Sequence, residues 1–379
     1  MHQNRPAADR SEPGGNPDRS TPDRSAPDRG PSDRSGASPA GTPTAPEDSS
    51  ELVLGMDVGG TTTRALLCDL AGNRHGRAVS GGGNPTAHRP HRASAALAVA
   101  LRGALAGTDP AEVRHGVVGL AGRRLLGRPE VRAAFRRAWE DAGLRCPMTV
   151  VPDAAVAFAA GSATGSGSVL IAGTGAIAVR MDRWEEVRRA DGLGWLLGDL
   201  GSGFWMGREA VRLTLEALSG RVHAPVLAPM VLEELLGSPA ASAPAAGPDP
   251  GGALANRLVA AVYADRPVAL ARLAPLVTAA AEHEDPAAAD LVEAAARHLM
   301  ATLAAVRRPG ERTPVVLAGS CLVTDNVLAR QVVRALDTQW PGAEVGWALD
   351  GAAGAAVLAA DSLGVDEATL ASMHRRLLA

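Results

Sequence analysis

Large apolar side chains are nearly absent from the first part of the chain and frequent in the rest. Residues 1–50 contain no valine, leucine, isoleucine, phenylalanine, tyrosine or tryptophan. Five-residue units that carry a Pro-Asp-Arg-Ser theme begin at residues 16, 21, 26 and 31. Such a segment cannot bury enough apolar surface to offset the entropy lost on folding. We therefore expect a disordered tail over residues 1–50 and folded sequence from about Leu52.

From Leu52 onward, short apolar runs are followed by Ala/Leu-rich segments in an order typical of α/β proteins. Three strands, a helix, a strand, a helix and a last strand are predicted in turn at residues 53–56, 65–68, 76–80, 94–106, 115–120, 130–141 and 149–151. This β-β-β-α-β-α-β order is that of an RNase H-like lobe.

A second copy of the same order follows. Its strands are predicted at residues 168–172, 176–180, 188–191, 315–318 and 344–348, with helices at 204 onward, 256–306, 327–336 and 352–361. We expect a disordered low-complexity loop at residues 238–252, which are rich in Ala, Pro, Ser and Gly.

The predicted fold class is therefore α/β, with two RNase H-like (actin-like ATPase) lobes and a cleft between them. The first lobe is expected over residues 51–153, joined by a C-terminal helix at 362–379, and the second over residues 154–361. The length of 379 residues agrees with two lobes, because one hydrophobic core seldom grows that large.

Composition narrows the function classes. A hydrophobic fraction of 46%, a charged fraction of 21% and a formal net charge of −3 describe a globular protein without a nucleic-acid or membrane signature. No apolar run approaches the roughly 18 residues of a membrane-spanning helix. The three cysteines have neither disulfide-framework nor zinc-ligand spacing. We expect a cytoplasmic protein with no nucleic-acid or membrane partner.

All 38 basic residues are arginine, since the sequence contains no lysine. This excludes a Walker A loop and any Schiff-base lysine. A bound phosphate must then be held by backbone N–H groups, hydroxyls, arginine or a metal ion, and Arg64 and Arg180 are candidate cations.

The most informative segment joins the first two predicted strands. Asp57 is followed by Gly59 and Gly60, and then by Thr61 and Thr62. Glycines allow the backbone to approach an anion, hydroxyls can bond phosphate oxygens, and a carboxylate at a strand end can hold Mg²⁺ directly or through water. An ordinary turn with an aspartate is the alternative.

Similar alternatives apply to three further segments. Asp153 follows a strand and precedes a small-residue helix, so it is either a helix cap or a general base. Gly173-Thr174-Gly175 is either a second phosphate turn or a plain β-turn. Gly319 and Ser320 end a strand where a flat adenosine could approach, although such joins are common.

Residues 192–205 combine five glycines with two tryptophans and Asp199, a composition that core packing does not explain. Taken in order, these segments resemble the N-acetylglucosamine kinase branch of the BadF/BadG/BcrA/BcrD ATPase family, within the sugar kinase and actin superfamily. The resemblance covers residues 52–375. It implies two RNase H-like lobes that close on ATP and a sugar.

The resemblance also implies roles for individual residues. Those matching the nucleotide elements are Asp57, Gly59, Gly60, Thr61, Thr62, Gly173, Thr174, Gly175, Gly319 and Ser320, with Asp57 as the Mg²⁺ residue. Asp153 matches the catalytic aspartate. Those matching sugar contacts are Asn84, Gly122, Asp153, Gly194, Trp195 and Asp199. Ala121 stands where related kinases carry a serine, which leaves the sugar preference open.

The function implied is ATP- and Mg²⁺-dependent phosphorylation of an amino sugar, with N-acetylglucosamine 6-phosphate as the leading product. Glucosamine, N-acetylmuramic acid or glucose are alternative substrates, and a homodimer is one candidate assembly. A nucleotide-gated regulator of a protein partner is the alternative from another class. The zinc-containing repressor/kinase group and the iron–sulfur dehydratase activators are disfavoured, because the cysteine clusters they need are missing.

Overall fold

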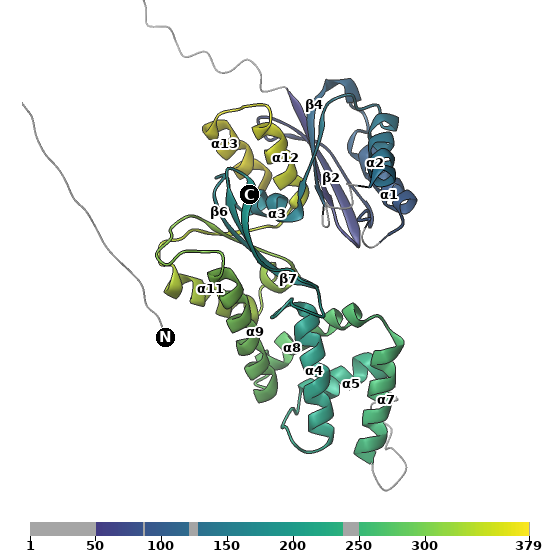
Figure 1. Ribbon diagram of the computed structural model, residues 1–379, viewed down its shortest axis with the longest axis vertical. Helices are drawn as coiled ribbons and strands as arrows, with labels where there is room; N and C mark the ends of the chain where they lie inside the picture. Colours follow the sequence, from purple (N-terminus) through teal and green to yellow (C-terminus); the bar gives the residue numbers. More distant parts are fainter. Residues whose placement is uncertain (1–50, 86–87, 121–127, 238–249, 379) are drawn as a thin grey trace, which may run out of the picture. The chain divides into compact units, whose positions relative to one another are not determined.

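The computed structural model describes residues 51–85, 88–120, 128–237 and 250–378. The predicted tail, Gly122 and most of the predicted low-complexity loop lie outside the described residues. Within the described ranges the chain forms two five-stranded mixed sheets with helices packed on them (Figure 1).

The first sheet has the strand order β3-β2-β1-β4-β5. Strands β1, β2 and β3 are antiparallel, whereas β4 and β5 run parallel to β1. The elements are β1 (Leu52–Val58), β2 (Thr62–Asp69), β3 (Arg74–Gly81), α1 (Pro90–Ala104), the 3₁₀ turn η1 (Pro110–Glu112), β4 (Val113–Leu120), α2 (Pro129–Asp141), β5 (Met148–Pro152) and α3 (Asp153–Gly161).

The second sheet has the order β10-β9-β6-β7-β8, which repeats the first sheet strand for strand. Its strands are β6 (Gly167–Ala172), β7 (Ala176–Asp182), β8 (Glu185–Asp191), β9 (Val315–Ala318) and β10 (Val345–Trp347). The β-β-β-α-β-α-β order predicted for both halves is thus observed twice, and the α/β fold with two RNase H-like lobes is confirmed.

The remaining helices all follow β8, and only some of them contact the second sheet. They are α4 (Gly203–Leu218), α5 (Leu227–Leu236), α7 (Pro250–Ala264), η3 (Pro267–Leu273), α8 (Ala274–Glu282), α9 (Pro286–Ala304), α10 (Ser320–Val323), α11 (Val327–Gln339), α12 (Gly351–Asp361) and α13 (Glu367–Leu378). Prolines begin α7, η3 and α9, as expected from a fixed φ and a missing N–H. Residues 250–252, predicted as loop, are therefore helical.

Strand β1 is buried on both faces, which explains the apolar run from Leu52 to Met56. Leu54 and Met56 pack with α1 and α2, while Val53 packs on the opposite side with α3 and α12. No helix in the described ranges has the length and apolarity needed to cross a bilayer.

Helix α12 lies against β1, β4 and α3 (Figure 1). The contact is between backbones, because a Cβ added at Gly55 would lie 2.1 Å from the Ala352 carbonyl oxygen, and one at Gly354 would lie 2.3 Å from the Val156 carbonyl oxygen. Helix α12 therefore packs with the first sheet, whereas the boundary predicted at residue 361 placed it in the second lobe.

The β1–α12 contact gives a test of the fold. Gly55→Ala should lower the free energy of unfolding by about 1–3 kcal/mol or more, because the added methyl group collides with rigid backbone. The measurement is the urea midpoint. Gly81→Ala is the matched control, since a Cβ at that strand glycine meets nothing within 4 Å. Equal midpoints for the two variants would contradict the backbone contact.

Candidate functional site

The turn between β1 and β2 is held from behind by the loop after β3. The Gly83 and Asn84 N–H groups donate to the Gly59 carbonyl at 3.2 and 3.1 Å, and the His88 Nε2 lies 2.7 Å from the Gly60 carbonyl oxygen. Gly59 N–H closes the turn onto the Thr62 carbonyl at 2.9 Å. The predicted phosphate turn is therefore fixed in one conformation, and Asn84 is buried beside it.

Asp57 is the penultimate residue of β1 and lies next to the first residue of α12. A Cβ at Gly351 would lie 2.7 Å from an Asp57 carboxylate oxygen, and the Arg64 guanidinium lies 3.6 Å from that carboxylate. Burial raises the pKa of Asp57 to about 6; Arg64 opposes this shift, and the carboxylates of Asp153 and Asp350 add to it. A cation would relieve this repulsion, so the oxygen donors here suit Mg²⁺.

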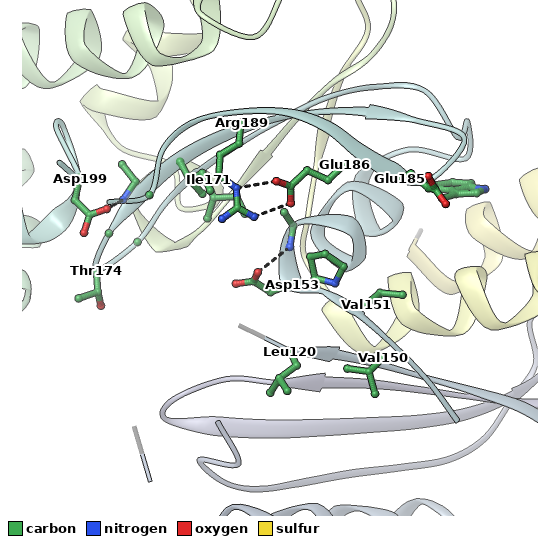
Figure 2. Close-up of a pocket in the computed structure, with 18 of the residues that line it drawn as sticks. Leu120, Val150, Val151, Asp153, Ile171, Thr174, Glu185, Glu186, Arg189 and Asp199 are labelled. Carbon is green, nitrogen blue, oxygen red and sulfur yellow. Dashed lines mark hydrogen bonds and ion pairs between the residues drawn. The ribbon is translucent and has the colours of Figure 1, made fainter. Parts of the chain in front are cut away.

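Asp153 begins α3 at the end of β5 and lines a cavity of about 940 Å³ (Figure 2). Its Oδ1 accepts the N–H of Ala154 at 3.0 Å. Solvent reaches the carboxylate through the cavity, yet protein crowds its other sides, and this burial raises the pKa of Asp153 while Arg189 acts against the shift. Asp153 is the first residue of α3, while Pro152 occupies the N-cap position, and its carboxylate faces open space, as a general base requires.

The second glycine turn joins β6 to β7 and is held by a carboxylate. The Asp199 Oδ1 accepts the Ala176 N–H at 3.1 Å, and a Cβ at Gly175 would lie 2.8 Å from the other Asp199 oxygen (Figure 2). The first residues of α4 complete the support, since the Gly203 N–H donates to the Gly173 carbonyl at 2.8 Å.

Asp199 is itself locked in place. It has a left-handed backbone with φ of +57°, and its N–H donates to an Asp191 carboxylate oxygen at 2.7 Å. Burial raises the pKa of the Asp199 carboxyl, and the Ala176 N–H opposes that shift. The predicted sugar contact of Asp199 remains a prediction; the contact that the structure adds is with the phosphate turn.

A second cavity, of about 510 Å³, lies on the other side of this turn. Its lining includes Ala274 and Thr278 of α8 and Ser320 of α10. Gly319, just before α10, has φ of +84°, and a Cβ there would lie 2.3 Å from the Ala172 carbonyl oxygen, so only glycine fits. Gly173 and Thr174 line both cavities, which therefore meet at the second turn.

The structure brings six of the predicted site residues to the two cavities. Those lining the two cavities are Asp153, Gly173, Thr174, Gly175, Asp199 and Ser320. The predicted nucleotide residues and the first-turn neighbour that line neither cavity are Asp57, Gly59, Gly60, Thr61, Thr62, Asn84 and Gly319. Gly194 and Trp195 line neither of these cavities. The ring of Trp195 packs edge-on against that of Phe204, with 5.7 Å between the ring centroids. The candidate cation Arg180 is held by Glu311 at 2.6 Å and lines neither cavity.

Four charged residues near the site were missed from the sequence: Glu185, which lines the larger cavity, and Glu186, Arg189 and Asp350. Glu186 and Arg189 of β8 line the larger cavity, joined by hydrogen bonds of 2.8 and 2.6 Å (Figure 2). Asp350 caps α12 by accepting the Ala352 N–H at 3.1 Å and lies 3.3 Å from Arg77. Only Asp350 could have been found from a sequence pattern, because it precedes the Gly-Ala-Ala-Gly start of a predicted helix.

The sequence profile of the BadF/BadG/BcrA/BcrD ATPase family matches residues 54–359. The chain belongs to this family. The matched region contains strands of both sheets and every element that lines the two cavities. No curated protein matches the sequence.

Solved structures agree with this family assignment at the level of the fold. A candidate N-acetylglucosamine kinase from Chromobacterium violaceum is 24% identical with a TM-score of 0.61, covering 82% of this chain and 99% of that one. A second candidate N-acetylglucosamine kinase, from Porphyromonas gingivalis, is 20% identical with a TM-score of 0.55, covering 86% of this chain and 98% of that one. Two lobes of the actin-like ATPase type are therefore shown for this BadF/BadG/BcrA/BcrD family member.

The support of the second turn by Asp199 can be tested by nucleotide binding. Asp199→Gly keeps the left-handed backbone without strain but removes the acceptor, so ATP affinity should fall about tenfold, the value of one charge-assisted hydrogen bond. Asp199→Asn keeps an acceptor oxygen and should retain most of the affinity. Calorimetry with a non-hydrolysable ATP analogue measures both, and wild-type affinity in the glycine variant would contradict the support.

Proposed function

We propose that this chain is an ATP-dependent kinase of an amino sugar, with N-acetylglucosamine as the leading substrate and the 6-phosphate as product. One observation carries the proposal. The cavity that contains the predicted adenosine element and the cavity that contains Asp153 meet at Gly173 and Thr174. A nucleotide bound in the smaller cavity would extend its phosphates past this turn toward the carboxylate.

In this proposal Asp153 accepts the proton of the sugar hydroxyl while that oxygen attacks the γ-phosphorus. The new O–P bond forms as the bond to the β-phosphate oxygen breaks, and ADP leaves. Backbone N–H groups of the two glycine turns stabilise charge on the transferring group.

Asp57 is the residue proposed to hold Mg²⁺, directly or through water. Among the described residues, no group of three His, Cys, Asp or Glu side chains is arranged to bind a metal. Mg²⁺ is usually held by one or two carboxylates together with substrate phosphates, so a single carboxylate such as that of Asp57 suits it. When bound, the ion would neutralise phosphate charge, a task for which this sequence has no lysine.

The choice of N-acetylglucosamine rests on the resemblance and on the two candidate N-acetylglucosamine kinases among the similar folds. A coupled ADP-release assay over a panel of sugars tests it directly. The panel should contain N-acetylglucosamine, glucosamine, N-acetylmuramic acid and glucose. ADP release stimulated by none of them would favour the nucleotide-gated regulator instead.

Removing the proposed base should separate chemistry from binding. Asp153→Ala should lower kcat by about 10²-fold or more, the usual contribution of a positioned general base, with little change in ATP affinity. Sugar-dependent ADP release and calorimetry measure the two quantities. Turnover near the wild-type rate in this variant would remove Asp153 from the mechanism.

Filling the smaller cavity tests the adenosine assignment independently. Thr278→Trp places an indole in the space that ADP would occupy, so ATP binding should weaken at least tenfold while the fold is kept. Thr338→Trp is the matched control, because both threonines lie on helices and donate to a carbonyl oxygen of the preceding turn, but Thr338 is exposed and lines neither cavity. Equal ATP affinity in the two variants would place the nucleotide elsewhere.

A further inference from the structure

A register shift in the second sheet places two charged side chains on one face. Arg188 of β8 pairs with Arg180 of β7, but the next pair joins Glu186 to Met181, so Val187 is left without a partner as a β-bulge. In a regular strand, residues three apart point to opposite faces. The extra residue brings Glu186 and Arg189 to the same face.

That face is the one directed at α3. Arg189 is the partner of Val179 and Glu186 is the partner of Met181. Paired residues of antiparallel strands share a face, and both Val179 and Met181 belong to the buried cluster that includes Phe158 of α3. Asp153 is the first residue of the same helix.

The pair is well fixed and faces the cavity. Two hydrogen bonds, of 2.8 and 2.6 Å, join the Arg189 guanidinium to the two Glu186 carboxylate oxygens, a bidentate geometry that restrains both side chains. Arg189 is the one cationic side chain among the described residues that line the cavity with Asp153 (Figure 2).

We propose that the Val187 bulge makes the Glu186–Arg189 pair a positioning device for Asp153, in which Arg189 keeps the carboxylate charged and available as a base. The inference rests on the proposed function, since it assigns a further residue to that site. Arg189 acts through Asp153 and is a positioning residue.

Charges around Asp153 decide the signs of the expected effects. On β8, the charge of Arg189 favours the ionised form of Asp153, whereas the charge of Glu186 disfavours it. Asp57 on β1 is a further carboxylate within electrostatic range, and Glu185 and Asp199 line the same cavity. The Ala154 N–H also stabilises the charged form. Arg189 is thus the one cationic side chain among the described residues that line this cavity, whose other charged side chains are acidic.

Two variants, each replacing a charged side chain by a neutral one, should shift the pKa of Asp153 in opposite directions. Arg189→Gln removes the favourable charge, so the pKa of Asp153 should rise by about half a unit to one unit. Glu186→Gln removes an unfavourable charge, so the pKa should fall, by a smaller amount. The acid limb of the pH profile of kcat/KM should move to higher pH in the first variant and to lower pH in the second, because the base must be deprotonated.

The direct measurement is a carbon-13 NMR titration of aspartate carboxyls in the full chain without nucleotide, with Asp153→Asn to assign the resonance. Arg188→Gln is the matched control, since Arg188 is the exposed neighbour on β8 and does not line the cavity. Thermal melting of each variant checks that it is folded.

Opposite shifts in the two variants, with none in the control, support the proposal. Shifts of the same sign, or no shift in folded Arg189→Gln, overturn it. Because the titration needs no substrate, it is separate from the kinase assay. A wild-type chain that phosphorylates no sugar would refute the proposed function while the electrostatic role of Arg189 is still decided by NMR.

Discussion

The backbone contact of α12 with β1 and α3 is the constraint on which the rest of the site depends. Helix α12 is composed almost entirely of alanine and glycine, and it approaches β1 at Gly55 and α3 at Gly354 more closely than any side chain would allow. Larger residues at these positions would push the helix away from the sheet. These close backbone contacts, which we call the α12 seam, therefore fix where the ends of β1, α3 and α12 lie.

Each of these elements has an aspartate at the end nearest the site. Asp57 is the penultimate residue of β1, Asp153 begins α3 and Asp350 precedes α12. The latter two carboxylates are close enough to Asp57 to raise its pKa, so the three side chains converge. Carboxylates held this close destabilise one another, which structures tolerate chiefly where a cation or a reaction uses them. The close packing of β1, α3 and α12 at the α12 seam therefore also brings their three aspartates together.

Much of the fold could be predicted because strand alternation and helix periodicity occur in the same order twice. The placement of α12 could not, since a helix of alanine and glycine has no polar face to show which side is buried, and its position depends on glycines that are distant in sequence. Within the site, glycines next to threonines marked both turns in the sequence. The part played by Asp199 in holding the second turn depends on a contact with Ala176, 23 residues away, that spacing alone does not reveal.

The Glu186–Arg189 pair shows a more general limit of prediction from sequence. On a regular strand these residues would lie on opposite faces, so their spacing argues against any contact between them. The bulge at Val187 reverses that expectation, yet it is visible only in the pairing of β8 with β7. In a chain without lysine, the cation beside the proposed base therefore depends on a one-residue irregularity in strand register, a feature that sequence composition and motifs do not record.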